Sequence, residues 1–187
     1  MPVPKPFFRT ARPFLDGHYE SFGNHYYAAD SKYAQDADKY VRYFLLLQKD
    51  FISLTDYIAL DDVNLKAYSL RTHELLIRTC IEIEANFRAI LIENGYQKGN
   101  NDRLNTNDYV KIDASHKLSE FKVRIPYWVG TKNIVQPFIG WSVANPTASL
   151  SWYNAYNTAK HDRHSGFAHA SMEALVGAMT ALVVVMS

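Results

Sequence analysis

The sequence predicts an all-α protein built on four principal helices. Two long segments, residues 31–59 and 64–94, repeat apolar residues at spacings of three and four, which is the pattern of one buried helix face. A third helical segment follows Asn145-Pro146, a pair typical of a helix start. The C-terminal residues are apolar on nearly every side, so we expect the last helix at the centre of a bundle.

The length and composition indicate one globular domain over residues 1–187. A chain of 187 residues with 48% hydrophobic and 21% charged side chains can bury a sizeable core, and its composition is not typical of disordered, fibrous or disulfide-scaffold proteins. The formal charge is only +1, so the whole molecule is not expected to attract nucleic acid or anionic lipid. Any basic surface must therefore be local.

Three observations favour a cytoplasmic protein without membrane association. The single cysteine, Cys80, allows no internal disulfide and no cysteine-based zinc site within one chain. The first residues contain three prolines by position 6 and no apolar stretch, unlike a secretory signal. The most apolar run, residues 174–186, is shorter than the roughly 20 residues that a helix needs to span a bilayer.

Residues 1–30 are rich in proline and then in aromatic side chains, without helical or alternating periodicity. Exposed aromatic clusters are unfavourable in water, so we expect an irregular arm that packs against the domain or a partner subunit. The first helix follows over about residues 31–59. Its apolar stripe consists of Tyr33, Ala37, Tyr40, Phe44, Leu47, Phe51, Leu54 and Ile58.

The second helix is expected over residues 64–94, so that the first two helices fill residues 31–95. Gly95 is placed where a left-handed residue commonly ends a helix. The buried seam consists of His73, Leu76, Cys80, Ile83, Phe87 and Ile90.

A charged face also runs along this second helix, where Glu74, Arg78 and Glu82 stand four residues apart, as do Glu84 and Arg88. One interpretation is a solvated face. The other is a functional carboxylate that faces a neighbouring helix, for which Glu82 is the candidate.

Residues 96–146 lose the helical period and form an irregular insertion between the second and third helices. The run from residue 97 to 108 is polar and typical of turns, and residues 122–125 alternate as in a short strand or hairpin edge. Basic side chains outnumber acidic ones here. Aromatic residues interleave with them, which fits a surface for single-stranded RNA but equally fits half-buried strands: Tyr109, Phe121, Tyr127, Trp128, Phe138 and Trp141.

The last two helices are expected over residues 147–187. Asn145 and Pro146 would open the third helix, which runs to about Arg163, and the fourth begins near Ser165-Gly166. The apolar residues of the fourth helix occupy several faces, which predicts a central position.

The junction of these two helices carries the residues that point to chemistry. Asn157, Lys160, His161 and His164 fall on one helical face. An arginine such as Arg163 can hold a phosphate through paired hydrogen bonds, and a histidine exchanges protons near neutral pH. Such a site would transfer a proton to or from RNA without a metal ion or another cofactor.

This junction resembles the HEPN (higher eukaryotes and prokaryotes nucleotide-binding) superfamily. The run RHSGFAH, from Arg163 to His169, matches the family's arginine, polar residue, four residues, histidine motif at the start of the last helix. The upstream pattern from Tyr156 to Arg163 is similar to a variant in HEPN-like bacterial proteins. The resemblance covers about residues 64–95 and 147–187.

The resemblance implies an α-helical bundle that forms a homodimer, with the motifs of both subunits in a shared cleft. Active family members are metal-independent endoribonucleases of toxin–antitoxin and phage-defence systems, so RNA and an antitoxin protein are the implied partners. By this analogy Arg163 would hold the scissile phosphate and His169 would act as general acid or base. Asn157, Lys160, His161 and His164 would orient the phosphate.

Other functions compete with this interpretation. A second class, which other family members represent, is a non-catalytic helical module that binds nucleotides or proteins. A zinc or iron site from His161, His164, His169 and Glu173 is geometrically conceivable, although its helix-spaced pairs lie on different expected helices. Cys80 is expected to be a buried structural residue, and no glycine-rich phosphate loop or nucleophile elbow is present in the sequence.

Overall fold

The computed structural model describes residues 37–99, 103–161 and 166–187, and it is mostly helical. The expected N-terminal arm over residues 1–30 lies outside these residues. The principal helices are α2 (Ala37–Thr55), α3 (Leu70–Glu93), α6 (Ser151–His161) and α7 (Met172–Met186). The shorter elements are η2 (Asp62–Asn64), α4 (Thr106–Tyr109), α5 (Ile112–His116), η4 (Leu118–Glu120), β1 (Val123–Arg124), β2 (Ile134–Val135) and η5 (Phe167–His169).

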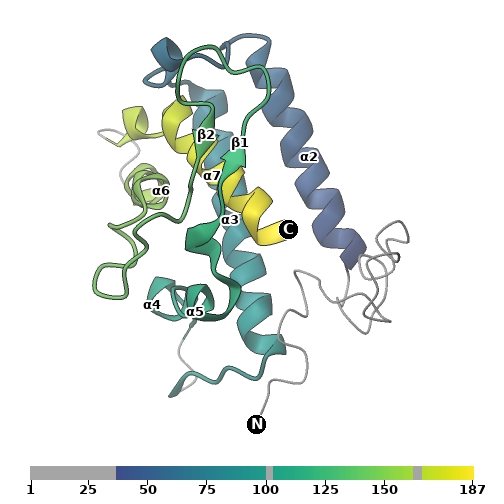
Figure 1. The fold of residues 1–187 in the computed structure, drawn as a ribbon, viewed down its shortest axis with the longest axis vertical. Helices are drawn as coiled ribbons and strands as arrows, with labels where there is room; N and C mark the ends of the chain where they lie inside the picture. The colour runs from purple at the N-terminus through teal and green to yellow at the C-terminus, as the bar shows by residue number, and fades with distance from the viewer. Residues whose placement is uncertain (1–36, 100–102, 162–165) are drawn as a thin grey trace.

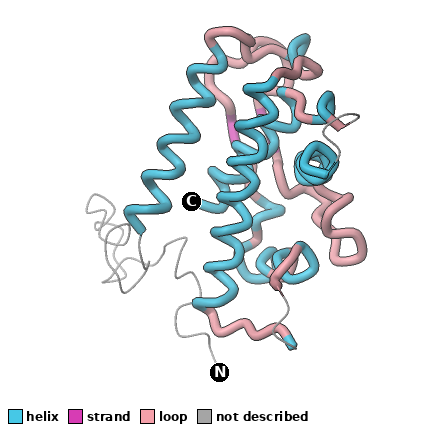
Figure 2. The backbone as a smooth tube through the Cα atoms, turned by 180° about the vertical axis from the view of Figure 1, so that it is seen from behind, coloured by secondary structure: helices cyan, strands magenta, loops and turns pink. Residues whose placement is uncertain are grey.

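Helix α7 forms the centre of the fold, as its sequence predicts. All of its residues from Ala174 to Leu182 are buried, and α7 packs against both α3 and α6. Figure 1 shows α6 on one side of α3 and α7, and α2 on the other side, and Figure 2 shows the same order from behind. Helix α6 approaches α7 closely at Gly177, where an added Cβ atom would lie 2.9 Å from the Cβ atom of Trp152.

Helix α3 carries the predicted seam and ends as predicted. Leu76, Cys80, Ile83, Phe87 and Ile90 are all buried, and Gly95 has a φ of +75°. The start differs from the expectation, because α3 begins at Leu70 rather than near residue 64. The side chains of Ser69 and Thr72 form a reciprocal capping box there, which satisfies two N–H groups of the first turn.

Helix α2 packs on α3 through the predicted apolar stripe. Leu47 and Leu54 are buried, and Phe44 and Phe51 pack against the core. Ile58 also packs against the core, but from the turn after α2, which ends at Thr55 rather than near residue 59. An ion pair of 2.6 Å between Arg78 of α3 and Asp50 of α2 joins the two helices beside this contact.

The segment between α3 and α6 belongs to the core, although little of it is regular. The ring of Trp141 stacks on Phe87 of α3 with centroids 5.5 Å apart, and Phe138 packs edge-on against Trp152 of α6. Tyr109 is buried as well. Three of the aromatic residues that a single-stranded RNA surface would need are therefore inside the molecule, which favours the packing interpretation. Phe121 and Tyr127 remain exposed.

The expected short strand is present in this segment. Val123 and Arg124 of β1 pair antiparallel with Val135 and Ile134 of β2. The loop between the strands is held to η2 by Asp62, whose carboxylate accepts hydrogen bonds from the Trp128 side chain, the Thr131 hydroxyl and the backbone N–H groups of Thr131 and Lys132.

Helices α6 and α7 begin later than the sequence predicts. Pro146 does not open α6: residues before Ser151 form turns, and the Pro146 carbonyl accepts the indole N–H of Trp141. Helix α7 begins at Met172, capped by Ser171, because the N–H groups of Met172 and Glu173 donate to the carbonyls of Ala67 and Leu65. A neighbouring segment thus satisfies the first donors of α7, which local sequence patterns do not reveal.

Candidate functional site

Helix α6 presents three of the predicted site residues. Asn157 is half-buried, and Lys160 and His161 are exposed in the last turn. A cation in the last turn interacts favourably with the partial negative charge at a helix C-terminus. The end of α6 therefore presents the cation of Lys160 on a chain that is almost neutral overall.

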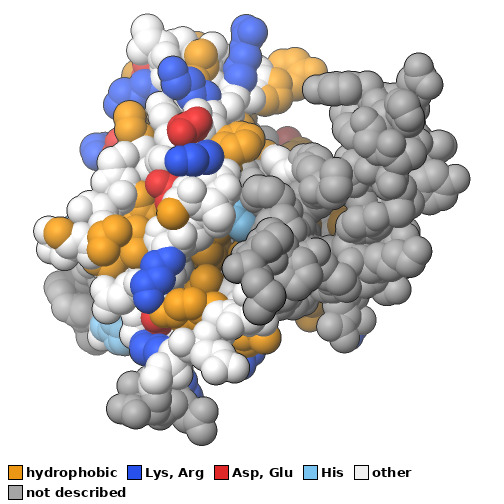
Figure 3. All heavy atoms as spheres, turned by 60° about the horizontal axis from the view of Figure 1, so that its bottom comes forward, with side chains coloured by type: hydrophobic (Ala, Val, Ile, Leu, Met, Phe, Trp, Pro, Cys, Tyr) orange, Lys and Arg blue, Asp and Glu red, His pale blue; other side chains and the backbone are white. Residues whose placement is uncertain are grey.

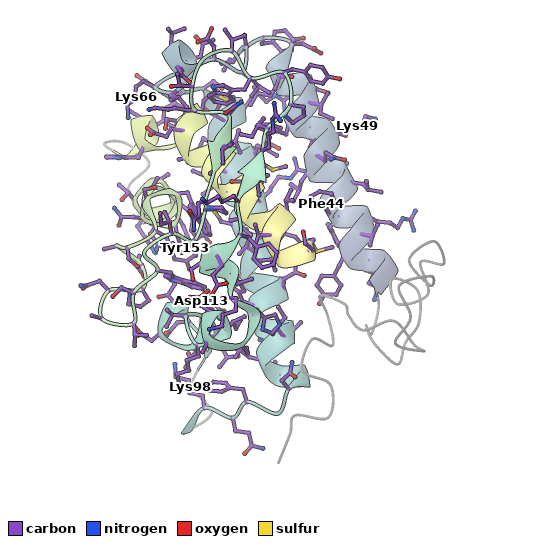
Figure 4. All side chains as sticks on the ribbon, in the orientation of Figure 1. Phe44, Lys49, Lys66, Lys98, Asp113 and Tyr153 are labelled. Atoms are coloured by element: carbon purple, nitrogen blue, oxygen red, sulfur yellow. The ribbon has the colours of Figure 1, made fainter. Side chains whose placement is uncertain are left out.

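Tyrosines on the face of α6 that also carries Lys160 join this helix to α3. Tyr153 and Tyr156 are buried, and the Tyr153 hydroxyl donates a hydrogen bond of 2.6 Å to Oε1 of Glu84. The Nζ atom of Lys160 donates to the Tyr156 hydroxyl at 3.1 Å and lies 5.1 Å from the centroid of that ring. Figure 4 shows Tyr153 projecting from α6 toward the middle of the molecule.

The environment keeps both phenols protonated at neutral pH. Burial raises the pKa of Tyr153 and Tyr156 above their ordinary value, and the carboxylate of Glu84 raises both further. Both hydroxyls can therefore donate a proton to a hydrogen bond, and neither is poised to act as a base. The cluster of Glu84, Tyr153, Tyr156 and Lys160, which we call the α3–α6 polar cluster, positions Lys160 at the end of α6.

Glu84 is a carboxylate that the structure joins to α6 and that the sequence did not single out. Glu82 is half-buried and accepts a hydrogen bond of 3.2 Å from the side chain of Asn86, one turn later on the same helix. A signal for Glu84 was present in the sequence, because it stands one turn after Cys80 at the edge of the apolar seam.

Cys80 is fully buried below this cluster, as predicted. Burial raises the pKa of its thiol well above the ordinary value, and the nearby charge of Glu84 acts in the same direction. A thiol in such surroundings is a poor nucleophile.

His169 lies in η5 and is exposed. It borders a small groove of about 360 Å³ together with Lys66, Ser151, Ala155, Ala168, Ser171, Glu173 and Ala174. Lys66 and Glu173 form an ion pair of 2.6 Å at this groove.

The structure does not bring His169 and Lys160 to the same face of α6. Lys160 follows Ala155 by five residues, which places it about 140° further around the helix. His169 borders the same groove as Ala155, so it lies away from the face of α6 that carries Lys160. The predicted Arg163 and His164 fall within residues 162–165, outside the described residues.

His73 is a further histidine at this end of α6. Its Nε2 atom lies 3.4 Å from the carbonyl oxygen of Ala159, and its ring packs against Phe167 of η5 with centroids 5.3 Å apart. The seam of α3 included His73, but nothing in the sequence indicated a contact with the α6–α7 junction.

Neither a metal centre nor a membrane helix is found among the described residues. No group of three or more His, Cys, Asp or Glu side chains there could hold a metal ion. Within the same ranges, no helix combines the length and apolarity needed to cross a membrane. No protein-family model, curated protein or solved structure matches the chain.

Proposed function

We propose that the protein binds RNA at the α6–α7 junction and cleaves it as a metal-independent endoribonuclease. The observation that carries this proposal is the end of α6, where Tyr156 anchors Lys160 and the exposed His161 follows, two positions before Arg163 in the chain. A cation fixed in this way attracts the phosphates of RNA.

The proposed reaction needs a phosphate-binding group and groups that move protons. Arg163 holds the scissile phosphate, and Asn157, Lys160, His161 and His164 orient it. His169 takes the proton of the ribose 2′-hydroxyl, whose oxygen attacks the phosphorus, and a protonated group at the junction returns a proton to the leaving 5′-oxygen. The products are a 2′,3′-cyclic phosphate and a 5′-hydroxyl end.

The positions of Lys160 and His169 constrain how RNA would lie. Because the groove that His169 borders is lined by Ala155, about 140° around α6 from Lys160, we expect the strand to cross the helix rather than run along its axis.

The resemblance to the HEPN superfamily also suggests which partners the protein has. We propose a homodimer that acts in the cytoplasm within a toxin–antitoxin or phage-defence system, with an antitoxin protein as its inhibitor. The competing function is a non-catalytic module that binds nucleotides or proteins through the same HEPN-like helices.

Cleavage of end-labelled single-stranded RNA in the presence of EDTA tests the enzymatic proposal. Wild-type protein is compared with Arg163→Ala and His169→Ala variants whose circular dichroism is unchanged, and with Arg124→Ala, which removes an exposed cation on β1. We expect cyclic phosphate ends that both junction variants abolish and the Arg124→Ala variant retains. Absence of cleavage across several RNAs would favour the non-catalytic module, and cleavage that EDTA blocks would contradict the proposed chemistry.

A further inference from the structure

A groove of about 710 Å³ lies where α3 ends, far from the α6–α7 junction. We call it the α3-end groove. Figure 4 labels Lys98 at this end of the molecule, and Figure 3, which brings that end forward, shows Lys and Arg side chains among apolar ones. The groove is lined by Arg88, Ile92, Tyr96, Gln97, Lys98, Arg103 and Leu104.

Two arginines of this groove have no ion-pair partner within the described part of the chain. Arg88 and Arg103 are both exposed, and none of the described residues that line the groove is acidic. In contrast, Arg78 of the same helix α3 is paired with Asp50 and with Glu74. Exposed guanidinium groups that border one groove and have no ion-pair partner are suited to bind an anion.

The floor of the groove is held in place by a buried carboxylate. Asp108 accepts hydrogen bonds from the Tyr96 hydroxyl at 2.8 Å and from Nζ of Lys98 at 3.0 Å, and its side chain is 5% exposed. Lys98 also donates to the carbonyl of Arg103 at 3.0 Å, which ties the two sides of the groove together. The arginines thus project from a backbone that is already fixed.

Among the described side chains around the groove, cations outnumber carboxylates. Lys111 lies beside the groove, where its Nζ atom donates to the Tyr96 hydroxyl and stands 4.7 Å from the centroid of that ring. Asp108 balances one of the four cations Arg88, Lys98, Arg103 and Lys111. Ile92, which is 49% exposed, and Leu104 supply an apolar wall beside these charges.

We propose that the α3-end groove binds the phosphate of a nucleotide or of an RNA strand. Arg88 and Arg103 would hold the phosphate oxygens, because a guanidinium group presents paired donors that match a phosphate. Ile92 and Leu104 would contact the sugar or base, and the Gln97 amide can bond to a base edge. The shared ligand chemistry is a phosphate ester that carries a planar base.

The groove lies along α3 from the candidate site, so one RNA strand could reach both. His73 contacts the end of α6, and Arg88 follows it by fifteen residues, a rise of about 22 Å along the helix. The inference that the groove binds an RNA strand rests on the proposed function, whereas the inference that it binds a free nucleotide does not. If the groove binds RNA, it adds binding energy at a distance from the scissile bond.

Binding measurements in the His169→Ala background test the inference without any cleavage. The probes are a fluorescein-labelled 12-nucleotide single-stranded RNA, followed by fluorescence polarisation, and adenosine 5′-monophosphate, followed by calorimetry. The variant is Arg88→Ala/Arg103→Ala. Its matched control is Lys122→Ala/Arg124→Ala, which removes two exposed cations outside the groove.

We expect the groove variant to lose on the order of tenfold in affinity, because two charged hydrogen-bonding groups are removed. For RNA, the slope of log affinity against log salt should fall by about 1.4, since each lost phosphate contact contributes about 0.7. The control pair should change neither quantity.

The two probes show whether the groove binds the phosphate of an RNA strand or that of a free nucleotide. Loss of RNA affinity alone assigns the groove to a strand, and loss of mononucleotide affinity assigns it to a free nucleotide. Equal losses in the groove variant and the control, or no binding of either probe by the His169→Ala protein, would overturn the inference. These results are independent of whether the wild-type protein cleaves RNA, so failure of the ribonuclease proposal remains distinguishable.

Discussion

Tyr153 of α6 donates a hydrogen bond of 2.6 Å to Glu84 of α3, and this bond joins residues that stand 69 positions apart in the chain. The bond holds α6 to α3 at one end of the α3–α6 polar cluster, while Lys160 leaves the other end toward solvent. A polar contact inside a mostly apolar interface fixes the rotation of α6, because any other rotation would leave a buried hydroxyl or carboxylate without its partner.

Removing the Tyr153 hydroxyl should destabilise the protein. Tyr153→Phe leaves the half-buried Glu84 carboxylate without this donor, so we expect a loss of about 1–3 kcal/mol in the free energy of unfolding. Urea denaturation measures this change. Tyr127→Phe is the control, because Tyr127 is 94% exposed.

A double-mutant cycle with Glu84→Gln isolates the bond itself. The effects of Tyr153→Phe and Glu84→Gln should not be additive, since both changes disrupt the same contact. Additive effects would show that the two side chains are not energetically coupled.

Gly177→Ala should destabilise the contact between α6 and α7. Alanine favours a helix over glycine by about 1 kcal/mol, which alone would stabilise α7. The added Cβ atom would lie 2.9 Å from Trp152, and overpacking of a core typically costs about 1–3 kcal/mol. We therefore expect a lower melting temperature. Gly99→Ala is the control because its added Cβ atom meets no atom within 4 Å, and a stabilised Gly177→Ala protein would contradict the close approach.

The parts of the fold that depend on local periodicity could be predicted from the sequence. The seam from Leu76 to Ile90 is buried along α3, Gly95 ends that helix in the left-handed region, and α7 is surrounded by other elements. In each case the residues that decide the structure are neighbours in sequence, so a single pattern contains the necessary information.

The rest depends on contacts between distant residues. Glu84 resembles a surface residue because Arg88 follows it by one turn, yet its hydrogen-bond partner Tyr153 lies on another helix. Phe138 and Trp141 have the composition of a base-stacking surface, but the aromatic cluster around Phe87 buries them. Composition alone does not distinguish these environments, because aromatic side chains favour both.

Cys80 should be unreactive in the folded protein. Its side chain is fully buried, and burial raises the pKa of the thiol, so little thiolate forms at neutral pH. We expect reaction with 5,5′-dithiobis(2-nitrobenzoic acid) only on the timescale of unfolding, and rapid reaction in denaturant. A Ser187→Cys variant supplies an exposed thiol as the positive control. Rapid labelling of Cys80 in the native wild type would contradict the packing of α3.

Asp62 should make the stability of the protein depend on acid pH. Hydrogen bonds from the backbone of Thr131 and the indole of Trp128, with smaller contributions from Lys132 and the Thr131 hydroxyl, hold the pKa of Asp62 well below its ordinary value of 3.8. A carboxyl group whose pKa is lower in the folded state stabilises the fold above its ordinary pKa, and this contribution disappears as the pH falls below that value.

The substitution Asp62→Asn should therefore lower the melting temperature at pH 7 and have a diminishing effect below about pH 4. An asparagine amide keeps one acceptor oxygen, whereas the carboxylate uses both of its oxygens to hold the loop between β1 and β2. Thermal unfolding from pH 2 to pH 7 measures the difference between the two proteins. Asp56→Asn, which changes an exposed carboxylate, should leave the profile unaltered. A constant difference between wild type and Asp62→Asn over the whole range would show that ionisation of Asp62 does not hold the loop.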